Sequence, residues 1–84
     1  MRQAIEEFKT TLKLRPDLEG VYYRLGQAQV ELGLDDDAIA SFQNEIANQD
    51  DYDTEIALAH VYEKKGMHDK AAEAMARAKK LKGE

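Results

Sequence analysis

The chain repeats itself at a spacing of 33 to 34 residues, and this period restricts its possible folds more than any other feature. At an offset of 33, small and apolar residues recur as four pairs: Leu25 and Leu58, Gly33 and Gly66, Ala38 and Ala71, Phe42 and Met75. At an offset of 34 in the other direction, Ala38 and Phe42 correspond to Ala4 and Phe8. A period of this length is typical of arrays in which each repeat is one supersecondary unit stacked on the next.

The stretch from Pro16 to Ile46 predicts two helices joined as a hairpin. Its first half has apolar side chains at three- and four-residue steps, namely Val21, Tyr22, Leu25, Ala28 and Leu32. Gly33 suits a left-handed C-terminal cap, and Asp35 to Asp37 offer an N-cap oxygen and favourable charge to the next helix. That helix has the same periodicity, in Ala38, Ile39, Phe42 and Ile46. So short a connection makes the two helices antiparallel neighbours.

Small residues lie on both apolar stripes of this hairpin. Gly26 is on the first helix and Ala38 opens the second. We expect them to let the two backbones approach closely, with the bulky Tyr22 and Phe42 filling the space further along.

Applied to the whole chain, the period predicts an all-α fold of five helices. We expect them at about 2–14, 19–33, 37–48, 53–66 and 69–82. Helix 2–14 is half a repeat, and the hairpins 19–48 and 53–82 are two complete ones. One proline and five glycines are too few turn residues for a sandwich or a barrel. At 84 residues the chain is expected to form a single domain, 1–84.

These residues resemble the tetratricopeptide repeat, whose pattern over 34 residues is W-x2-L-G-x2-Y, A-x3-F and P. The matching positions are Tyr22 in place of Trp, then Leu25, Gly26, Ala38 and Phe42, with the earlier Pro16, while Gln29 departs from the usual Tyr. In the last hairpin Leu58 and Tyr62 match, whereas Ala59 replaces the Gly and Met75 the Phe. The resemblance implies an α-solenoid, a right-handed superhelix of helix hairpins. It also implies that the first helix of each hairpin lines a concave groove for peptides or helices of partner proteins.

Five residues are candidates for this groove, because they lie on the faces that line it in similar proteins: Tyr23, Gln27, Val30, Ile56 and His60. Tyr23 and Ile56 would be apolar anchors, and Gln27 and His60 would hydrogen-bond a peptide backbone. Alternatively, Val30 and Ile56 simply pack on a neighbouring helix. Similar proteins that clamp a terminal carboxylate use Lys, Arg and Asn, where this chain has Tyr23, Gln27 and Asp53. A receptor for chaperone tails is therefore not expected.

The expected function is that of a non-catalytic protein-interaction module, a scaffold or adaptor that binds a protein or peptide partner. An alternative is a self-associating or structural segment of a longer repeat protein. Helix 2–14 lacks the partner helix that would cover Ile5 and Leu12, so this stripe could pair with a second copy in a homodimer.

Charge is unevenly distributed along the chain. The segment 25–63 contains ten acidic residues and no Lys or Arg, whereas 64–84 has seven basic residues against three acidic ones. This distribution favours a basic partner or head-to-tail contacts and disfavours nucleic acid on the acidic segment. Alternatively, these are ordinary solvated helix faces. The basic helix 69–82 has too weak an apolar face for membrane insertion, and we expect it to be a terminal capping helix.

Catalytic and metal-binding patterns are sparse, so no enzyme activity, cofactor or metal is expected. Cysteine is absent. His60 and His68 lack metal-ligand spacing, and we expect Glu63 to form a surface pair with His60. Ser41 has no nucleophile motif around it.

Two further patterns bear on ion binding and location. The acidic run 50–55 lacks the central glycine of a calcium loop, so we expect it to cap a helix N-terminus. With no membrane-spanning run and no leader pattern, a cytoplasmic location is expected.

Overall fold

The computed structural model describes residues 2–83, and its regular structure over that range consists of α-helices joined by turns. Five helices follow one another: α1 (Arg2–Leu14), α2 (Val21–Glu31), α3 (Asp35–Asn48), α4 (Tyr52–Lys64) and α5 (His68–Lys82). The all-α class and the existence of five helices are confirmed. The expected bounds 19–33 and 53–66 are too long at the C-terminal end, because α2 and α4 end before the left-handed turns at Gly33 and Gly66. The first and last residues of the expected domain, 1–84, lie outside the described range.

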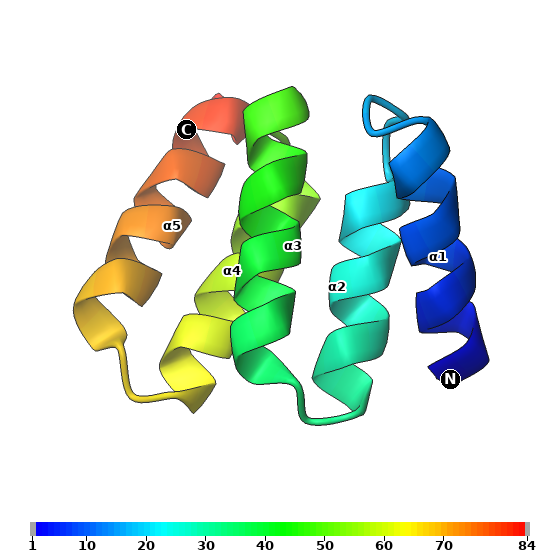
Figure 1. Ribbon diagram of the computed structural model, residues 1–84. Helices are drawn as coiled ribbons and strands as arrows, with labels where there is room; N and C mark the ends of the chain where they lie inside the picture. The colour runs from blue at the N-terminus through cyan, green and yellow to red at the C-terminus, as the bar shows by residue number, and fades with distance from the viewer. Residues whose placement is uncertain (1, 84) are drawn as a thin grey trace.

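Neighbouring helices pack in antiparallel pairs, as Figure 1 shows. Each helix contacts the next one along the chain, and α2 also contacts α4. This additional contact places the first helices of the two complete hairpins side by side. The whole forms a helical-repeat solenoid, 35 by 25 by 14 Å in its principal extents.

The same turn connects the two helices in both hairpins. Gly33 and Gly66 each have a φ of 77°, a left-handed conformation that glycine adopts without steric cost. After each glycine a backbone amide closes the turn, from Leu34 to the Gln29 carbonyl and from Met67 to the Tyr62 carbonyl, both at 2.8 Å. These are Schellman caps, and the prediction of a left-handed cap at Gly33 is confirmed.

The starts of α3 and α4 are built differently. The N-cap of α3 is Leu34, with no side-chain capping bond, so the expected N-cap from Asp35 to Asp37 is wrong. The Schellman turn runs directly into α3 and leaves the three acids inside its first turn, where they still favour the helix dipole. At α4 the prediction of capping is confirmed, because Asp51 accepts hydrogen bonds from the Thr54 amide at 2.8 Å and the Thr54 hydroxyl at 2.9 Å.

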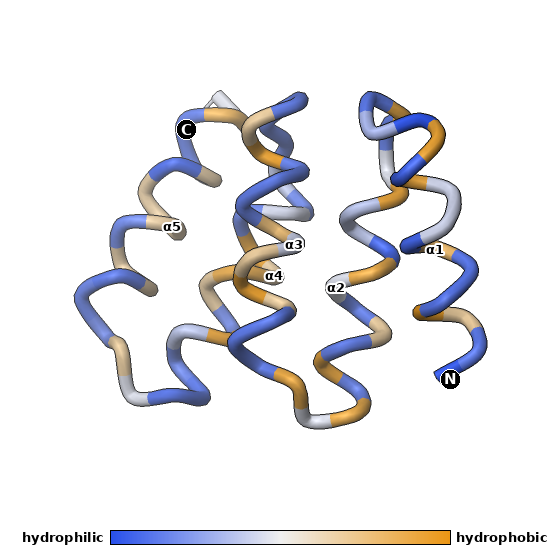
Figure 2. Tube along the Cα trace, viewed as in Figure 1, coloured by the Kyte–Doolittle hydropathy of each residue, from blue (hydrophilic) through white to orange (hydrophobic). Residues whose placement is uncertain are grey.

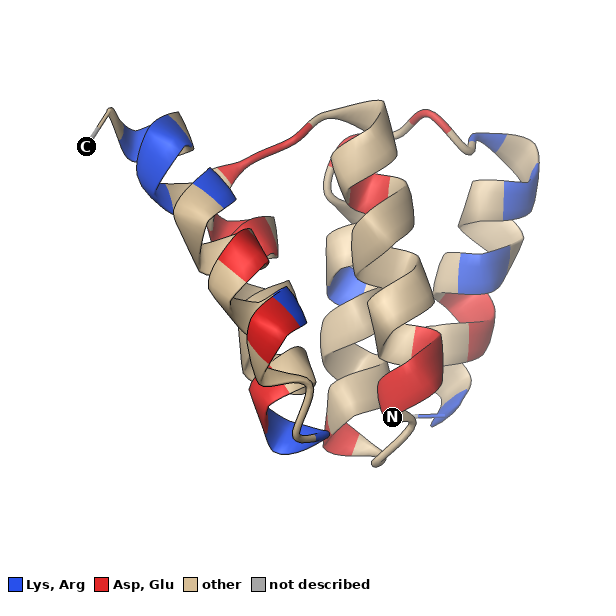
Figure 3. Cartoon of the chain, turned by 90° about the vertical axis from the view of Figure 1, so that its left-hand side faces the viewer, with Lys and Arg blue, Asp and Glu red and all other residues tan. Residues whose placement is uncertain are grey.

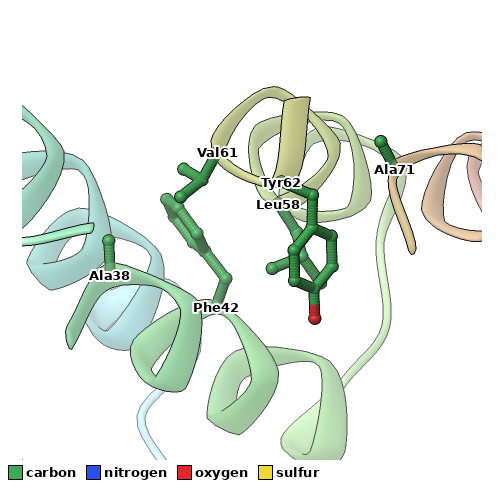
Figure 4. Close-up of a cluster of buried hydrophobic side chains, with 6 residues drawn as sticks. All are labelled: Ala38, Phe42, Leu58, Val61, Tyr62 and Ala71. Atoms are coloured by element: carbon green, nitrogen blue, oxygen red, sulfur yellow. The ribbon is translucent and has the colours of Figure 1, made fainter. Parts of the chain in front are cut away.

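The larger core lies between α3 and α4. It contains Ala38, Phe42, Leu58, Val61, Tyr62 and Ala71. In Figure 4 the Phe42 ring points from α3 toward Val61 of α4. The expectation that Phe42 fills space further along the hairpin from Gly26 is wrong, because the Phe42 ring lies directly against Gly26.

The second core joins α1 to α2 and corrects an expectation. Ile5 and Leu12 are 5% and 7% exposed and pack with Leu25 and Ala28. The expectation that these two residues are uncovered is therefore wrong. The stripe that they occupy faces α2, which covers it, whereas Leu14 at the end of α1 is 76% exposed.

Buried polar residues also connect the helices. The Ser41 hydroxyl donates to Gln29 Oε1 at 2.6 Å, so Gln29, which departs from the usual Tyr, has its own partner across the hairpin. Glu45 is buried, and its Oε2 accepts from the Gly20 amide at 3.0 Å. This carboxylate fixes the C-terminal half of α3 to the start of α2, where the helix dipole favours negative charge.

Helix α5 packs on α4 through alanines, and most of its remaining surface is polar (Figure 2). Ala71, Ala74 and Ala78 are almost completely buried. Beside them, Arg77 Nε donates to both carboxylate oxygens of the buried Glu55, at 3.1 and 3.0 Å. This pair attaches the middle of α5 to the first turn of α4. Because α4 forms one wall of the site described next, the pair also supports that wall.

Candidate functional site

A cavity of about 280 Å³ opens between α2 and α4. It is lined by Gln27, Val30 and Glu31 of α2, Phe42 of α3, and Ala57, His60, Val61 and Lys64 of α4. We call it the α2–α4 groove. It exists because α2 and α4 lie side by side on one face of the solenoid, with α3 behind them.

The floor of the groove is apolar and firmly held. Phe42 and Val61 are 1% and 3% exposed and belong to the larger core. The Tyr23 ring packs on Phe42 with ring centroids 5.9 Å apart and an interplanar angle of 48°. Such a tilted contact is favourable for aromatic pairs, so we expect the floor to keep its shape when a ligand binds.

A small residue keeps the groove open. Ala57 lines it from α4 with a single methyl group. A larger side chain at this position would occupy the space in front of Phe42 and Val61. The depth of the groove thus depends on Ala57 as well as on the spacing of the two helices.

The rim at the C-terminal ends of α2 and α4 is polar. Gln27 and His60 offer hydrogen-bonding groups, and Glu31 and Lys64 carry charge. Lys64 Nζ already donates to Asp35 Oδ1 at 3.2 Å, which compensates its positive charge. Within residues 2–83, Glu31 forms no ion pair.

Beyond Tyr23, toward the N-terminal end of α4, the surroundings are acidic. Burial raises the pKa of the Tyr23 hydroxyl, and the negative charges of Asp53 and Asp51 raise it further. Asp51 is occupied in capping α4. Asp53 is exposed in the first turn and is available to a ligand.

The structure brings together three of the five residues expected in the groove. Gln27, Val30 and His60 line the cavity, and Tyr23 packs on its floor residue Phe42. Ile56 is half-buried and does not line the cavity. It lies one helical turn before His60, so it could contact only a ligand that extends beyond the cavity.

Sequence reasoning did not place Ala57, Phe42 and Val61 in the groove. Phe42 was expected only in the hairpin core, and it serves both as core and as floor. Ala57 could have been identified from the sequence, because it is a small residue on the helix face between the apolar stripe and His60.

The expected surface pair of Glu63 with His60 is wrong. Glu63 instead contacts His68, with 2.6 Å between Glu63 Oε1 and His68 Nδ1. The turn at Gly66 brings the first residue of α5 back to the last turn of α4. His60 faces the groove and is left free of that carboxylate.

Two further features concern metal binding and membrane insertion. Residues 2–83 contain no group of three or more His, Cys, Asp or Glu residues arranged to hold a metal ion. None of the helices in that range has the length and apolar character needed to cross a membrane.

Stacked antiparallel hairpins with a groove between their first helices define a helical-repeat protein. A family model described as tetratricopeptide repeat matches residues 19–44 and 56–84, which is more than half of the chain. The chain belongs to the tetratricopeptide repeat family. No curated protein matches it. Repeats of this family are generally protein–protein interaction modules and are typically not catalytic.

Proposed function

We propose that the chain is a non-catalytic scaffold or adaptor that binds a peptide or helix of a partner protein in the α2–α4 groove. The observation that carries this proposal is the open cavity with an apolar floor, Phe42 and Val61, and a polar rim that includes Gln27 and His60. Binding sites commonly combine an apolar surface with a few convergent polar groups. A side chain of the partner would fill the cavity, while the rim would hydrogen-bond its backbone.

The predicted contacts have distinct roles in this proposal. Val30 would contact the inserted side chain, and Gln27 and His60 would bond the segment on either side of it. Tyr23 would extend the contact toward the N-terminal end of α4. Ile56 would add an apolar contact only for a longer segment.

The alternative of self-association through Ile5 and Leu12 assumed that these side chains are exposed, and they are not. Both side chains are buried against α2, so a second copy could reach them only if α1 separated from α2. The groove needs no such rearrangement.

A groove-filling variant tests the proposal. Peptides are selected from a random 12-residue phage-displayed library against the native chain, and their affinities are measured for Ala57→Leu and Ala72→Leu. Ala57 lines the groove, whereas Ala72 is an exposed alanine on α5, so the second variant adds the same bulk elsewhere. We expect Ala57→Leu to weaken binding at least about tenfold, as loss of one buried side chain contact does. Equal binding to both variants, or no peptide that depends on Ala57, would contradict the proposal.

A further inference from the structure

In the described part of the chain, two carboxylates near the α2–α4 groove are free of ion pairs. Glu31 lines the cavity at the end of α2 and forms no ion pair within residues 2–83. Asp53 is exposed at the start of α4. The two carboxylates lie toward opposite ends of the groove, because α2 and α4 run in the same direction.

The lysines near the groove are already engaged. Lys64 donates to Asp35 at 3.2 Å, and Asp35 is itself only 20% exposed in its side chain. The next residue, Lys65, contacts Asp36 at 2.7 Å. An anionic ligand would have to compete with these carboxylates of the same chain. The one exposed base of α2, Arg24, forms no ion pair within residues 2–83, and the two free carboxylates Glu31 and Asp53 outnumber it.

The pKa of the Tyr23 hydroxyl indicates negative charge at the N-terminal end of α4 as well. Its pKa is raised, first by burial and then by Asp53 and Asp51, because a phenolate would be repelled by these carboxylates. A cation at this place would be attracted instead. The last turn of α5 carries the three lysines Lys79, Lys80 and Lys82, and basic residues gather at this end of the helix in Figure 3.

We propose that the groove is selective for a basic and apolar linear segment of its partner. One apolar side chain enters the cavity over Phe42 and Val61, and a Lys or Arg nearby in the segment reaches Asp53, with Glu31 attracting a second cation at the opposite end. This inference rests on the proposed function and adds the chemical class of the partner. Apolar contact supplies affinity, and the complementary charges supply selectivity and a faster association.

Helix geometry sets the spacing of the two features. Asp53 precedes Ala57 by four residues and Val61 by eight, which is about 6 and 12 Å along α4 at 1.5 Å per residue. An apolar side chain midway along the cavity thus lies about 10 Å from Asp53. In an extended segment this separation corresponds to about three residues.

The test uses the phage-displayed library described above. Peptides that lose binding to Ala57→Leu but not to Ala72→Leu are the groove-dependent set. We expect this set to be enriched in Lys or Arg about three residues from an apolar residue. Synthetic copies are then titrated by fluorescence polarisation against native chain, Asp53→Asn and Asp69→Asn. Asp69 is a matched control, because it is an exposed acid in the first turn of α5.

We expect Asp53→Asn to weaken these peptides about three- to tenfold at low salt, and less at 0.5 M salt, because exposed charges are screened. Asp69→Asn should leave their affinity within about twofold, since rim charges far from the ligand contribute little. A charge swap strengthens the test. Asp53→Lys should bind a peptide whose critical Lys is replaced by Glu better than it binds the original peptide.

Three other outcomes would overturn the inference. Groove-dependent peptides that are acidic or uncharged, or that ignore Asp53→Asn, overturn this inference and leave the proposed function standing. A set with no groove-dependent peptide overturns both. Light scattering on the native chain covers the remaining occupant: a dimer that Ala57→Leu dissociates would assign the groove to a second copy and overturn the inference.

Discussion

Gly26 of α2 lies directly against the ring of Phe42 of α3, so closely that a Cβ at Gly26 would be 2.5 Å from Phe42 Cε1. Real Cβ atoms essentially never approach another heavy atom this closely. Phe42 is 1% exposed and forms the groove floor, so its ring has little room to move away. The glycine therefore sets the distance between the two helices of the hairpin and, through Phe42, the position of the groove floor.

We expect Gly26→Ala to destabilise the chain, although alanine favours helices. Overpacking a core costs about 1 to 3 kcal/mol, and the gain in helix propensity returns about 1 kcal/mol. The net loss in the free energy of unfolding should therefore be up to about 2 kcal/mol, measured by urea denaturation followed by circular dichroism.

A second substitution checks the cause. Phe42→Leu removes the ring edge, so adding Gly26→Ala to it should cost much less than in the native chain. At the corresponding place in the second hairpin, alanine is native as Ala59, with Met75 where Phe42 stands in the first. If the two substitutions are additive, the ring contact does not explain the effect.

The sequence predicted the hairpins because their signals are local. The three- and four-residue periodicity around Leu25, the glycine at Gly33 and the offset to Leu58 are all properties of short stretches. They are sufficient to determine the helices and the turns, and the structure keeps both. They do not determine which stripes face each other, because the stripe of α2 around Leu25 packs on α1, whereas Phe42 of α3 packs with α4.

The sequence could not predict features that depend on how the helices rotate and end. Leu12 is covered because α1 turns its stripe toward α2, and Glu63 reaches His68 because the turn at Gly66 reverses the chain. The groove depends on the distance between α2 and α4. This distance is set jointly by residues of two helices that are far apart in the sequence. The resemblance to known repeats therefore placed Gln27 and His60 on groove-lining faces, but neither it nor the periodicity identified Phe42 and Val61 as the floor.

The burial of α1 predicts different costs at two nearby leucines. Leu12 is 7% exposed and packs on α2, so Leu12→Ala should lower the free energy of unfolding by about 2 to 4 kcal/mol. Leu14 is 76% exposed, and Leu14→Ala should change it by less than about 0.5 kcal/mol. Urea denaturation gives both values, and amide hydrogen exchange in α1 shows whether the loss is local. Equal effects at the two positions would mean that α1 does not pack on α2 in solution.

Capping at α4 predicts another contrast. Asp51 accepts two hydrogen bonds from Thr54, and Asp51→Ala should cost about 1 kcal/mol, within the usual range for an N-cap. Asp37 lies in the first turn of α3 without a side-chain capping bond at that helix start. Asp37→Ala should cost only a few tenths of a kcal/mol through the helix dipole. Thermal unfolding of the two variants would reveal an error in this assignment if Asp37→Ala were the more damaging one.

The buried Glu55 predicts a pH dependence of stability with a definite sign. Burial raises the pKa of the Glu55 carboxyl above its ordinary value of 4.5, and Asp50 contributes to the rise, while the hydrogen bond from Arg77 opposes it. The folded chain therefore binds the proton of Glu55 more tightly than the unfolded chain does. Its contribution to stability is fully present below about pH 4.5 and is lost as the pH rises through the folded pKa.

Replacement by glutamine isolates this contribution, because Glu55→Gln cannot titrate. The free energy of unfolding of the native chain minus that of Glu55→Gln should fall as the pH rises above about 4.5, as Glu55 ionises in its buried site. Urea denaturation of both chains across this range provides the measurement. Arg77→Gln removes the group that favours the ionised carboxylate. Because Arg77 stabilises the charged form, its loss raises the folded pKa of Glu55, and the fall should move to higher pH. A difference that rises with pH would show that the pairing with Arg77 outweighs burial in solution.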